Sequence, residues 1–200
     1  MKTATTILLA AAALVLAAAT AAAAERWVVA PGDGTRIVFT SKAPLESFDG
    51  QTGQVSGWLE FDPQDLLAQP AFEIAVDLAS FDTGNRKRNG HMRDNHLETG
   101  TYPRAWLRGG TVVETTAAAL APGGTATVRL ACELDLHGVV KPLVCEARLA
   151  RAADGTVTVE AAFEVKLSDH AIDRPRFLVL KLADEQQVKV ALELRPETGP

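Results

Sequence analysis

The stretch from Val128 to Leu149 reads VRLACELDLHGVVKPLVCEARL, and its alternation indicates the fold class. Apolar residues occupy every second position on both sides of a turn, which is the pattern of two antiparallel strands that each bury one face. We expect a four-residue turn at 137–140, with His137 fixing it through a hydrogen bond rather than contacting a ligand. The stretch therefore predicts a β-hairpin.

That turn length sets a register in which every inward pair is apolar, including Leu134 with Leu143. It also places Cys132 directly opposite Cys145. Opposed residues in such a pair lie about 4.5 Å apart at Cα, which is within the range of a disulfide. The sequence thus predicts a Cys132–Cys145 disulfide; two buried free thiols are the alternative.

The same alternation recurs on both sides of this hairpin, whereas helical signals are few. About eight strands with one apolar face each predict an all-β protein, either a sandwich or a closed antiparallel barrel. An eight-stranded barrel is wide enough to be filled by side chains or to hold one small ligand. The further expected strands span 35–41, 51–61, 71–80, 104–108, 111–115, 157–165, 177–182 and 188–194, with a turn at 45–50.

A polar segment at 80–103 interrupts the strands with three glycines and a cluster of cations. A connection this long inside a compact domain is more often functional than idle, although a solvated crossover is the plain alternative. Within it, 89–97 has the composition of a short helix with Asn89 as its N-cap. Tyr102-Pro103 ends the segment, since a residue before proline avoids the helical region.

The first 24 residues have the features of a secretory signal peptide: a lysine, an apolar run and an Ala-x-Ala site before a charged residue. A membrane anchor is the alternative, but the run is mostly alanine. We expect a periplasmic protein with no membrane span after cleavage, one domain at 25–195 and a disordered tail at 196–200. The net charge of −5 gives no global attraction for nucleic acid.

Four segments, taken in order, resemble the YceI-like proteins, which are secreted bacterial lipid- and polyisoprenoid-binding barrels. Together they extend over about 35–194. They are FDG at 48–50 through GWLEFDP at 57–63; SFDTGN at 80–85 with RNGHMR at 88–93 and YP at 102–103; LDLHGVVKP at 134–142; and FEVKL at 163–167 with Ile172 three residues before Pro175.

The resemblance implies an extended eight-stranded antiparallel barrel, lipocalin-like in shape, with one or two short helices in the polar segment. It implies a binder or carrier rather than an enzyme, with no cofactor and with a polyprenyl lipid or fatty-acid derivative in an apolar tunnel. The chain departs from the family pattern at Asn89, where aspartate is usual, at 97–101, and at Trp106 and Leu107. These departures bear on ligand length and head group more than on the fold.

The inward alternation of the strands predicts which residues line the pocket, and the cation cluster predicts which residues contact the head group of the ligand. Cations pair with the oxygens of a pyrophosphate or carboxylate head, although solvated cations are the alternative. The expected pocket lining is Phe39, Phe72, Ile74, Val76, Leu130, Leu134, Val159, Phe163, Phe177 and Val190, and the expected head-group residues are Arg86, Lys87, Arg88, His91 and Arg93.

A second hypothesis is a secreted metalloprotein or hydrolase that uses His91, Asp94 and His96. Two histidines five residues apart face different sides of a helix, and the chain has neither an HExxH nor a GxSxG motif. We therefore expect no metal site and no catalytic residues. The sequence leaves a homodimer open.

Overall fold

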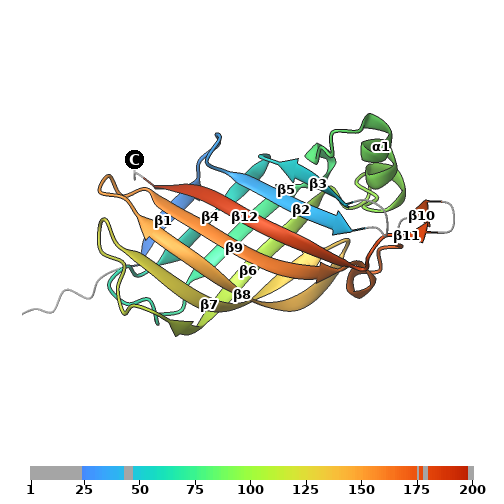
Figure 1. Ribbon diagram of the computed structural model, residues 1–200. Coiled ribbons are helices and arrows are strands. Elements are labelled where there is room, and N and C mark those ends of the chain that lie inside the picture. Colours follow the sequence, from blue (N-terminus) through green and yellow to red (C-terminus); the bar gives the residue numbers. More distant parts are fainter. Residues whose placement is uncertain (1–23, 43–46, 175, 178–179, 198–200) are drawn as a thin grey trace, which may run out of the picture.

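Eight antiparallel strands close into an elongated barrel in the computed structural model, which describes residues 24–42, 47–174, 176–177 and 180–197 (Figure 1). The wall runs β1–β4–β5–β6–β7–β8–β9–β12, and β12 pairs with β1 to close it. This confirms the predicted all-β barrel. The strands are β1 Glu25–Val29, β2 Arg36–Lys42, β3 Ser47–Thr52, β4 Val55–Phe61, β5 Ala71–Asp77, β6 Arg104–Thr115, β7 Thr125–Leu136, β8 Val139–Arg151, β9 Val157–Lys166, β10 Arg176–Phe177, β11 Leu180–Lys181 and β12 Glu185–Pro196; the helices are η1 Leu78–Ser80, α1 Arg86–Asn95 and η2 Leu167–His170.

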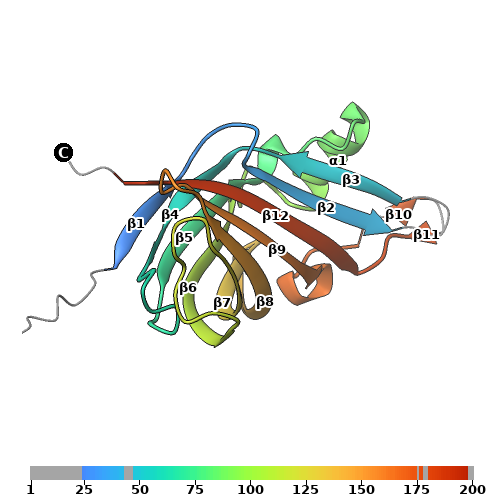
Figure 2. The same cartoon turned by 60° about the vertical axis from the view of Figure 1, so that its left-hand side comes forward.

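One edge of β12 is shared by two strands. Its last residues pair with β1, whereas its middle pairs with β2, so that β2 extends the wall beyond β1 toward the end where α1 lies (Figures 1 and 2). β3 then pairs with the free edge of β2. The turn predicted at 45–50 is therefore wrong from Ser47 onward, because the open edge of β2 offers those residues a ladder of backbone hydrogen bonds.

The β7–β8 hairpin forms as predicted, but its register differs by two residues. The turn has two residues, His137 and Gly138, and both have positive φ, at 55° and 73°. That is the geometry of the tight turns that match the twist of antiparallel strands. The observed register also sets Arg129 opposite Glu146, whereas the predicted one put two arginines opposite each other.

The predicted disulfide needed the wrong register. Cys132 lies opposite Leu143, Cys145 lies opposite Leu130, and both cysteines are free, buried thiols in the structure. The two side chains are diagonal neighbours on the inner face, and a hydrogen bond to the Cys145 sulfur, together with burial, raises the pKa of Cys132. The Cys132 thiol therefore stays protonated at neutral pH, which makes it a poor nucleophile.

The end of the barrel farthest from α1 is filled by its own side chains. Trp27 is fully buried and stacks on Phe61 with ring centroids 4.4 Å apart. Its indole nitrogen donates to the Gly155 carbonyl at 3.0 Å, which satisfies its polar atom. Leu120 and Leu194 are buried around it. This end is therefore closed to solvent.

The two ends of the chain fall largely outside the described residues. Residues 1–23 of the expected signal peptide and the last three residues of the expected tail lie there. Pro196, however, belongs to β12, and the Glu197 amide donates to the Arg26 carbonyl at 2.8 Å, so the predicted disorder is wrong for these two residues. Among the described residues, no helix has the length and apolar character to cross a bilayer.

Gly57 in β4 provides a test of the barrel wall. Its φ is 140°, and a Cβ atom there would lie 2.0 Å from the Glu73 carbonyl oxygen. We expect Gly57→Ala to lower the free energy of unfolding by more than about 2 kcal/mol, measured by urea denaturation, because strain and a backbone clash add. Gly100→Ala is the control, since no atom of the described part of the chain lies within 4 Å of its added methyl group. Equal losses in both variants would contradict the β4–β5 packing.

Candidate binding cavity

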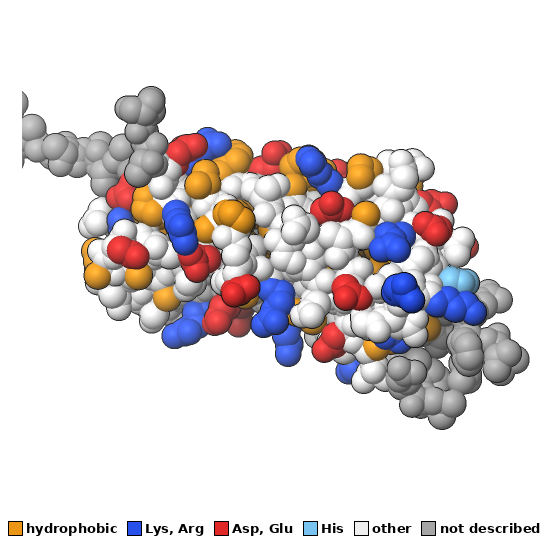
Figure 3. Space-filling view, turned by 90° about the horizontal axis from the view of Figure 1, so that it is seen from above, with side chains coloured by type: hydrophobic (Ala, Val, Ile, Leu, Met, Phe, Trp, Pro, Cys, Tyr) orange, Lys and Arg blue, Asp and Glu red, His pale blue; other side chains and the backbone are white. Residues whose placement is uncertain are grey.

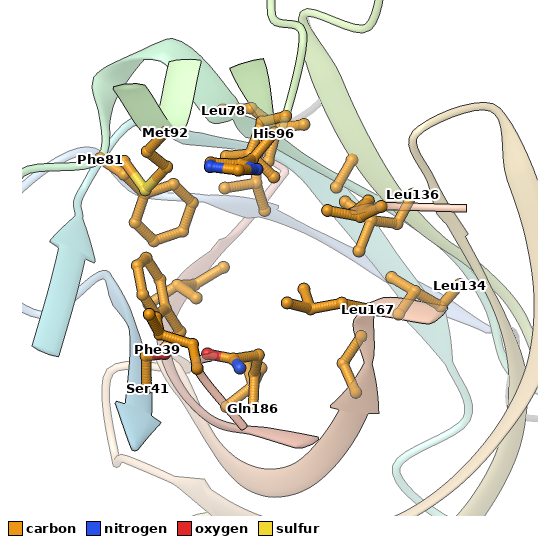
Figure 4. A pocket seen from close by; sticks show the side chains of 18 of the residues that line it. Phe39, Ser41, Leu78, Phe81, Met92, His96, Leu134, Leu136, Leu167 and Gln186 are labelled. Atoms are coloured by element: carbon orange, nitrogen blue, oxygen red, sulfur yellow. The ribbon is translucent and has the colours of Figure 1, made fainter. Parts of the chain in front are cut away.

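The barrel is hollow at the α1 end. A cavity of about 840 Å³ opens there, within the size range of ligand pockets, roughly 300–1,000 Å³. Figure 4 shows side chains pointing into it from several sides around an open centre. The barrel strands line it with Ile37, Phe39, Ile74, Val76, Ala105, Leu107, Leu134, Leu136, Phe163, Val165, Val188 and Val190.

The wall opens where two neighbouring strands part. β8 and β9 pair only between Glu146–Arg151 and Val157–Ala162, so toward α1 their remaining residues are not hydrogen-bonded to each other. The helix η2 bridges this gap. The buried His170 contacts the Val139 carbonyl through Nδ1 at 3.0 Å, and its own carbonyl lies 3.1 Å from Nδ1 of His137. The divergence widens the barrel, and η2 keeps its edge closed.

His137 has the turn-fixing role that the sequence predicted. Besides the His170 contact, its Nε2 lies 2.9 Å from a carboxylate oxygen of Glu98, and its ring packs on Tyr102 with centroids 4.3 Å apart. It therefore joins the β7–β8 turn to η2 and to the segment that follows α1. It does not line the cavity.

A capping segment, residues 78–102, folds across the open end and contains η1 and α1 (Figure 1). The strand predicted at 71–80 ends at Asp77, whose carboxylate accepts from the Ala79 amide and starts η1. The helix predicted at 89–97 begins earlier than expected, at Arg86. Its N-cap is Asn85, whose side chain accepts from the amides of the second and third helical residues.

Asn89 is buried within α1 and anchors the helix instead of capping it. Its Oδ1 accepts from the Thr83 amide at 2.9 Å and from the Thr83 hydroxyl at 2.6 Å. Its Nδ2 donates to Asp82 at 2.8 Å, and this bond, with another from the Gly84 amide, lowers the pKa of the Asp82 carboxyl. One amide side chain thus fixes α1 to the loop before it.

The capping segment gives the cavity an apolar ceiling that the predicted lining lacked. Leu78 and Phe81 are buried, and Met92 and Leu97 of the α1 region complete this surface (Figure 4). Leu78 continues the inward alternation of β5, so its position on the lining could have been predicted from the sequence. Met92 and Leu97 follow no strand or helix period, so only the fold brings them to the cavity.

The predicted lining residues lie on two neighbouring cavities. Phe39, Val76 and Leu134 line the large one; Phe72, Leu130 and Val159 line a smaller one of about 100 Å³; Ile74, Phe163 and Val190 line both. Phe177 lies in β10, whose side chains are outside the described part of the structure. Alternation alone therefore located the inner surface of the barrel, but it gave no information on where that surface is hollow.

The five predicted head-group residues separate into two groups. Lys87, Arg88 and His91 lie on the cavity lining at its mouth, together with Asn85 and His96. Arg86 and Arg93 are not part of that lining; the Arg93 guanidinium lies 3.4 Å from the Ala79 carbonyl. Figure 3 shows blue cations beside a pale-blue histidine at the end of the molecule where α1 lies.

Arg88 and Lys87 differ in how they are held. Arg88 donates to the Thr83 hydroxyl at 2.9 Å and to the Thr83 carbonyl at 2.8 Å, and its guanidinium lies 3.9 Å from the centre of the Phe48 ring. It braces the mouth. Lys87 is exposed, and within the described residues no carboxylate pairs with its ammonium group. Lys87 is therefore available to an anion.

His91, Asp94 and His96 do not form a metal site. Among the described residues, no three histidine, cysteine or acidic side chains gather closely enough to hold an ion. Nδ1 of His96 instead lies 3.0 Å from the Asp173 carbonyl. Burial, with a smaller contribution from repulsion by His91, lowers the pKa of His96. Within the described residues, the metal-binding form of the second hypothesis therefore has no cluster of ligands to rest on.

Polar atoms inside the cavity are concentrated on the β2–β12 wall. The Ser41 hydroxyl is buried and has no hydrogen-bond partner among the described residues. Gln186 beside it donates its side-chain amide to the Ala183 carbonyl at 2.8 Å (Figure 4). The remaining wall is almost entirely hydrocarbon. Such a chamber excludes water and favours an apolar guest.

Comparison with known proteins agrees with this geometry. Residues 27–194 match the YceI-like domain family. A UPF0312 protein from Vibrio parahaemolyticus is 27% identical over 106 residues, which cover 52% of this chain and 51% of that protein, and a UPF0312 protein from Vibrio campbellii matches equally. The chain thus spans about half the length of these curated relatives.

Solved structures show the same fold. BcnA from Burkholderia cenocepacia is 22% identical with a TM-score of 0.66, and the match covers 80% of this chain and 95% of BcnA. A polyisoprenoid binding domain from Saccharophagus degradans is 21% identical with a TM-score of 0.66, covering 86% and 99%. A YceI protein from Campylobacter jejuni is 19% identical with a TM-score of 0.56, covering 75% and 85%.

Removing the Asn89 side chain tests how the capping segment is held. We expect Asn89→Ala to lower the free energy of unfolding by about 1–3 kcal/mol, because the buried Thr83 amide loses its acceptor. In the same variant, the backbone amides of α1 should exchange their hydrogens with solvent faster than in the parent protein. Asp94→Ala, on the exposed side of the same helix, is the control and should leave both measurements nearly unchanged. Unchanged α1 protection in Asn89→Ala would contradict the anchoring role.

The lowered pKa of His96 gives a pH dependence with a definite sign. The folded state favours the neutral ring, so protonation of the unfolded state removes stability as pH falls below the unfolded pKa of about 6.5. We expect His96→Gln to lose less stability than the parent protein between about pH 8 and pH 5.5, measured by urea denaturation. Parallel pH profiles for the two proteins would refute this.

Proposed function

This chain belongs to the YceI-like domain family, and from that premise we propose that it binds a lipid with a long apolar tail inside its barrel. The observation that carries the proposal is the apolar cavity of about 840 Å³, which is open at one end and closed at the other. A guest of this chemistry also fits the name of one structural relative, a polyisoprenoid binding domain.

The energetics favour a tail over a compact polar ligand. Each methylene transferred from water into such a chamber contributes about 0.8 kcal/mol. A tail of about twenty carbons therefore offsets association costs of roughly 4–15 kcal/mol. A polar molecule of the same size would lose its hydration and find few partners on the lining. The cavity thus selects for hydrocarbon.

The head of the lipid stays at the mouth in this account. Lys87, Arg88 and His91 lie there, and the ammonium group of Lys87 is the one most available to a phosphate or carboxylate. Arg88 contributes positive potential from its fixed position on Thr83. Arg86 and Arg93 lie off the lining and have no part in the proposal. The neutral alternative is an alcohol head, for which Lys87 is unimportant.

The proposed setting is the periplasm, with the protein sequestering or carrying its lipid as a non-enzymatic binder. The signal-peptide pattern at 1–24 supports this setting. The proposal holds for a monomer and for a homodimer, because each barrel has its own cavity and mouth.

Lipid extraction tests the proposal directly. Purified protein extracted with organic solvent should release a stoichiometric lipid, identified by mass spectrometry, and added prenyl lipids should raise the Tm of stripped protein. An extract free of lipid, together with an unchanged Tm, would overturn the proposal.

Charge at the mouth has its own test. We expect Lys87→Ala to weaken binding of a prenyl phosphate about two- to fivefold, as befits an exposed ion pair, and to leave binding of the matching prenyl alcohol unchanged. Arg86→Ala removes a neighbouring exposed charge off the lining and serves as the control. Equal effects of the two variants on both lipids would remove Lys87 from the head-group site.

A further inference from the structure

The large cavity is separated from the smaller one by a ring of four side chains. Ile74, Leu107, Phe163 and Val190 line both cavities, so they stand at the boundary between them. We call this ring the waist. Beyond it lies a space of about 100 Å³, and beyond that the closed end around Trp27. A tail that enters at the mouth therefore meets the waist before the end of the barrel.

The strand order explains why these four residues form a ring. Ile74 and Leu107 are directly paired neighbours on β5 and β6. In the closed wall, β9 and β12 are the strands diametrically opposite β5 and β6, and they supply Phe163 and Val190. The four side chains thus converge from facing walls. Phe163 carries the largest of the four side chains.

The volume above the waist limits the tail. A methylene group occupies about the volume of a water molecule in its liquid, roughly 30 Å³, so 840 Å³ accommodates about 28 such groups. That corresponds to about five to six isoprene units. The smaller cavity adds space for only about three more groups, and only if the waist opens.

We propose that the waist is a chain-length stop, so that the barrel holds at most about 28 carbons of a lipid tail. The proposal rests on the lipid-binding function proposed above. Longer tails bind with their extra units outside the mouth, in water, where they contribute nothing to affinity. Phe163 is the specificity-determining residue, and Leu107 supports it from the opposite wall.

A length series on the unmodified protein is the first test, with prenyl alcohols of about two to nine isoprene units as probes. Dissociation constants, measured by displacement of a fluorescent fatty acid, should fall at least about tenfold per added unit up to five or six units. They should then stay constant within about threefold. Continued tightening through nine units would overturn the stop, whereas no binding at any length would overturn the lipid-binding function itself.

Removing the ring of Phe163 is the second test. Phe163→Ala merges the two cavities, and the ring volume plus about 100 Å³ gives space for about one to two more isoprene units. The length at which affinity levels off should move outward by that amount. If Phe163→Ala does not fold, as judged by its circular dichroism, Leu107→Ala opens the same ring from the opposite wall.

Val144→Ala is the matched control, because Val144 is 52% exposed on the outer face of β8 and does not line either cavity. It removes apolar bulk from the barrel without touching the passage, so its levelling-off length should equal that of the parent protein. A levelling-off length that stays fixed in both waist variants, or moves equally in Val144→Ala, would overturn the role of the waist.

Discussion

The structure depends on one imbalance: the apolar faces of eight strands all turn inward, but the side chains they carry fill only part of the enclosed space. At one end Trp27, Phe61 and Leu194 are large enough to meet across the barrel and close it. At the other end the facing residues leave about 840 Å³ between them. Protein interiors are normally packed as densely as organic crystals, so a void of this size indicates space kept for a guest.

The rest of the architecture keeps that void open. The parting of β8 from β9 widens the wall, and η2 holds the widened edge through His170. The capping segment covers the mouth. The hydrogen bonds between Asn89 and Thr83 that fix it lie within the segment itself and do not reach into the cavity. Polar bonds thus lie around the rim, where their geometry fixes the opening, and the interior stays hydrocarbon.

Period-two alternation predicted an all-β fold because one face of every strand is buried, and the family resemblance favoured the barrel over the sandwich. The alternation located inward residues such as Ile74 and Phe163 for the same reason. It missed the hairpin register because a non-glycine residue, His137, adopts positive φ in a two-residue turn with Gly138. The contacts that stabilise it come from Glu98 and the η2 region, far away in sequence.

The composition of the capping segment predicted either a functional segment or a solvated crossover, and its geometry was not predictable. Several polar side chains there can serve as an N-cap, and Asn85, four residues before the expected cap at Asn89, is the one that caps. Asn89 looked like a cap because asparagine favours that position; its burial reverses its role. The residue at which α1 begins decides which of its cations face the mouth. A helix that began one residue later would turn different cations toward it.

The most direct measurement is a crystal structure of the protein with a fatty acid that carries bromine at its tail end, analysed by anomalous diffraction. The account predicts a bromine peak inside the barrel, enclosed by Ile74, Leu107 and Phe163, with the carboxylate at the mouth near Lys87. An interior closed by its own phenylalanine and leucine side chains, with bromine found only on the outer surface, would contradict it.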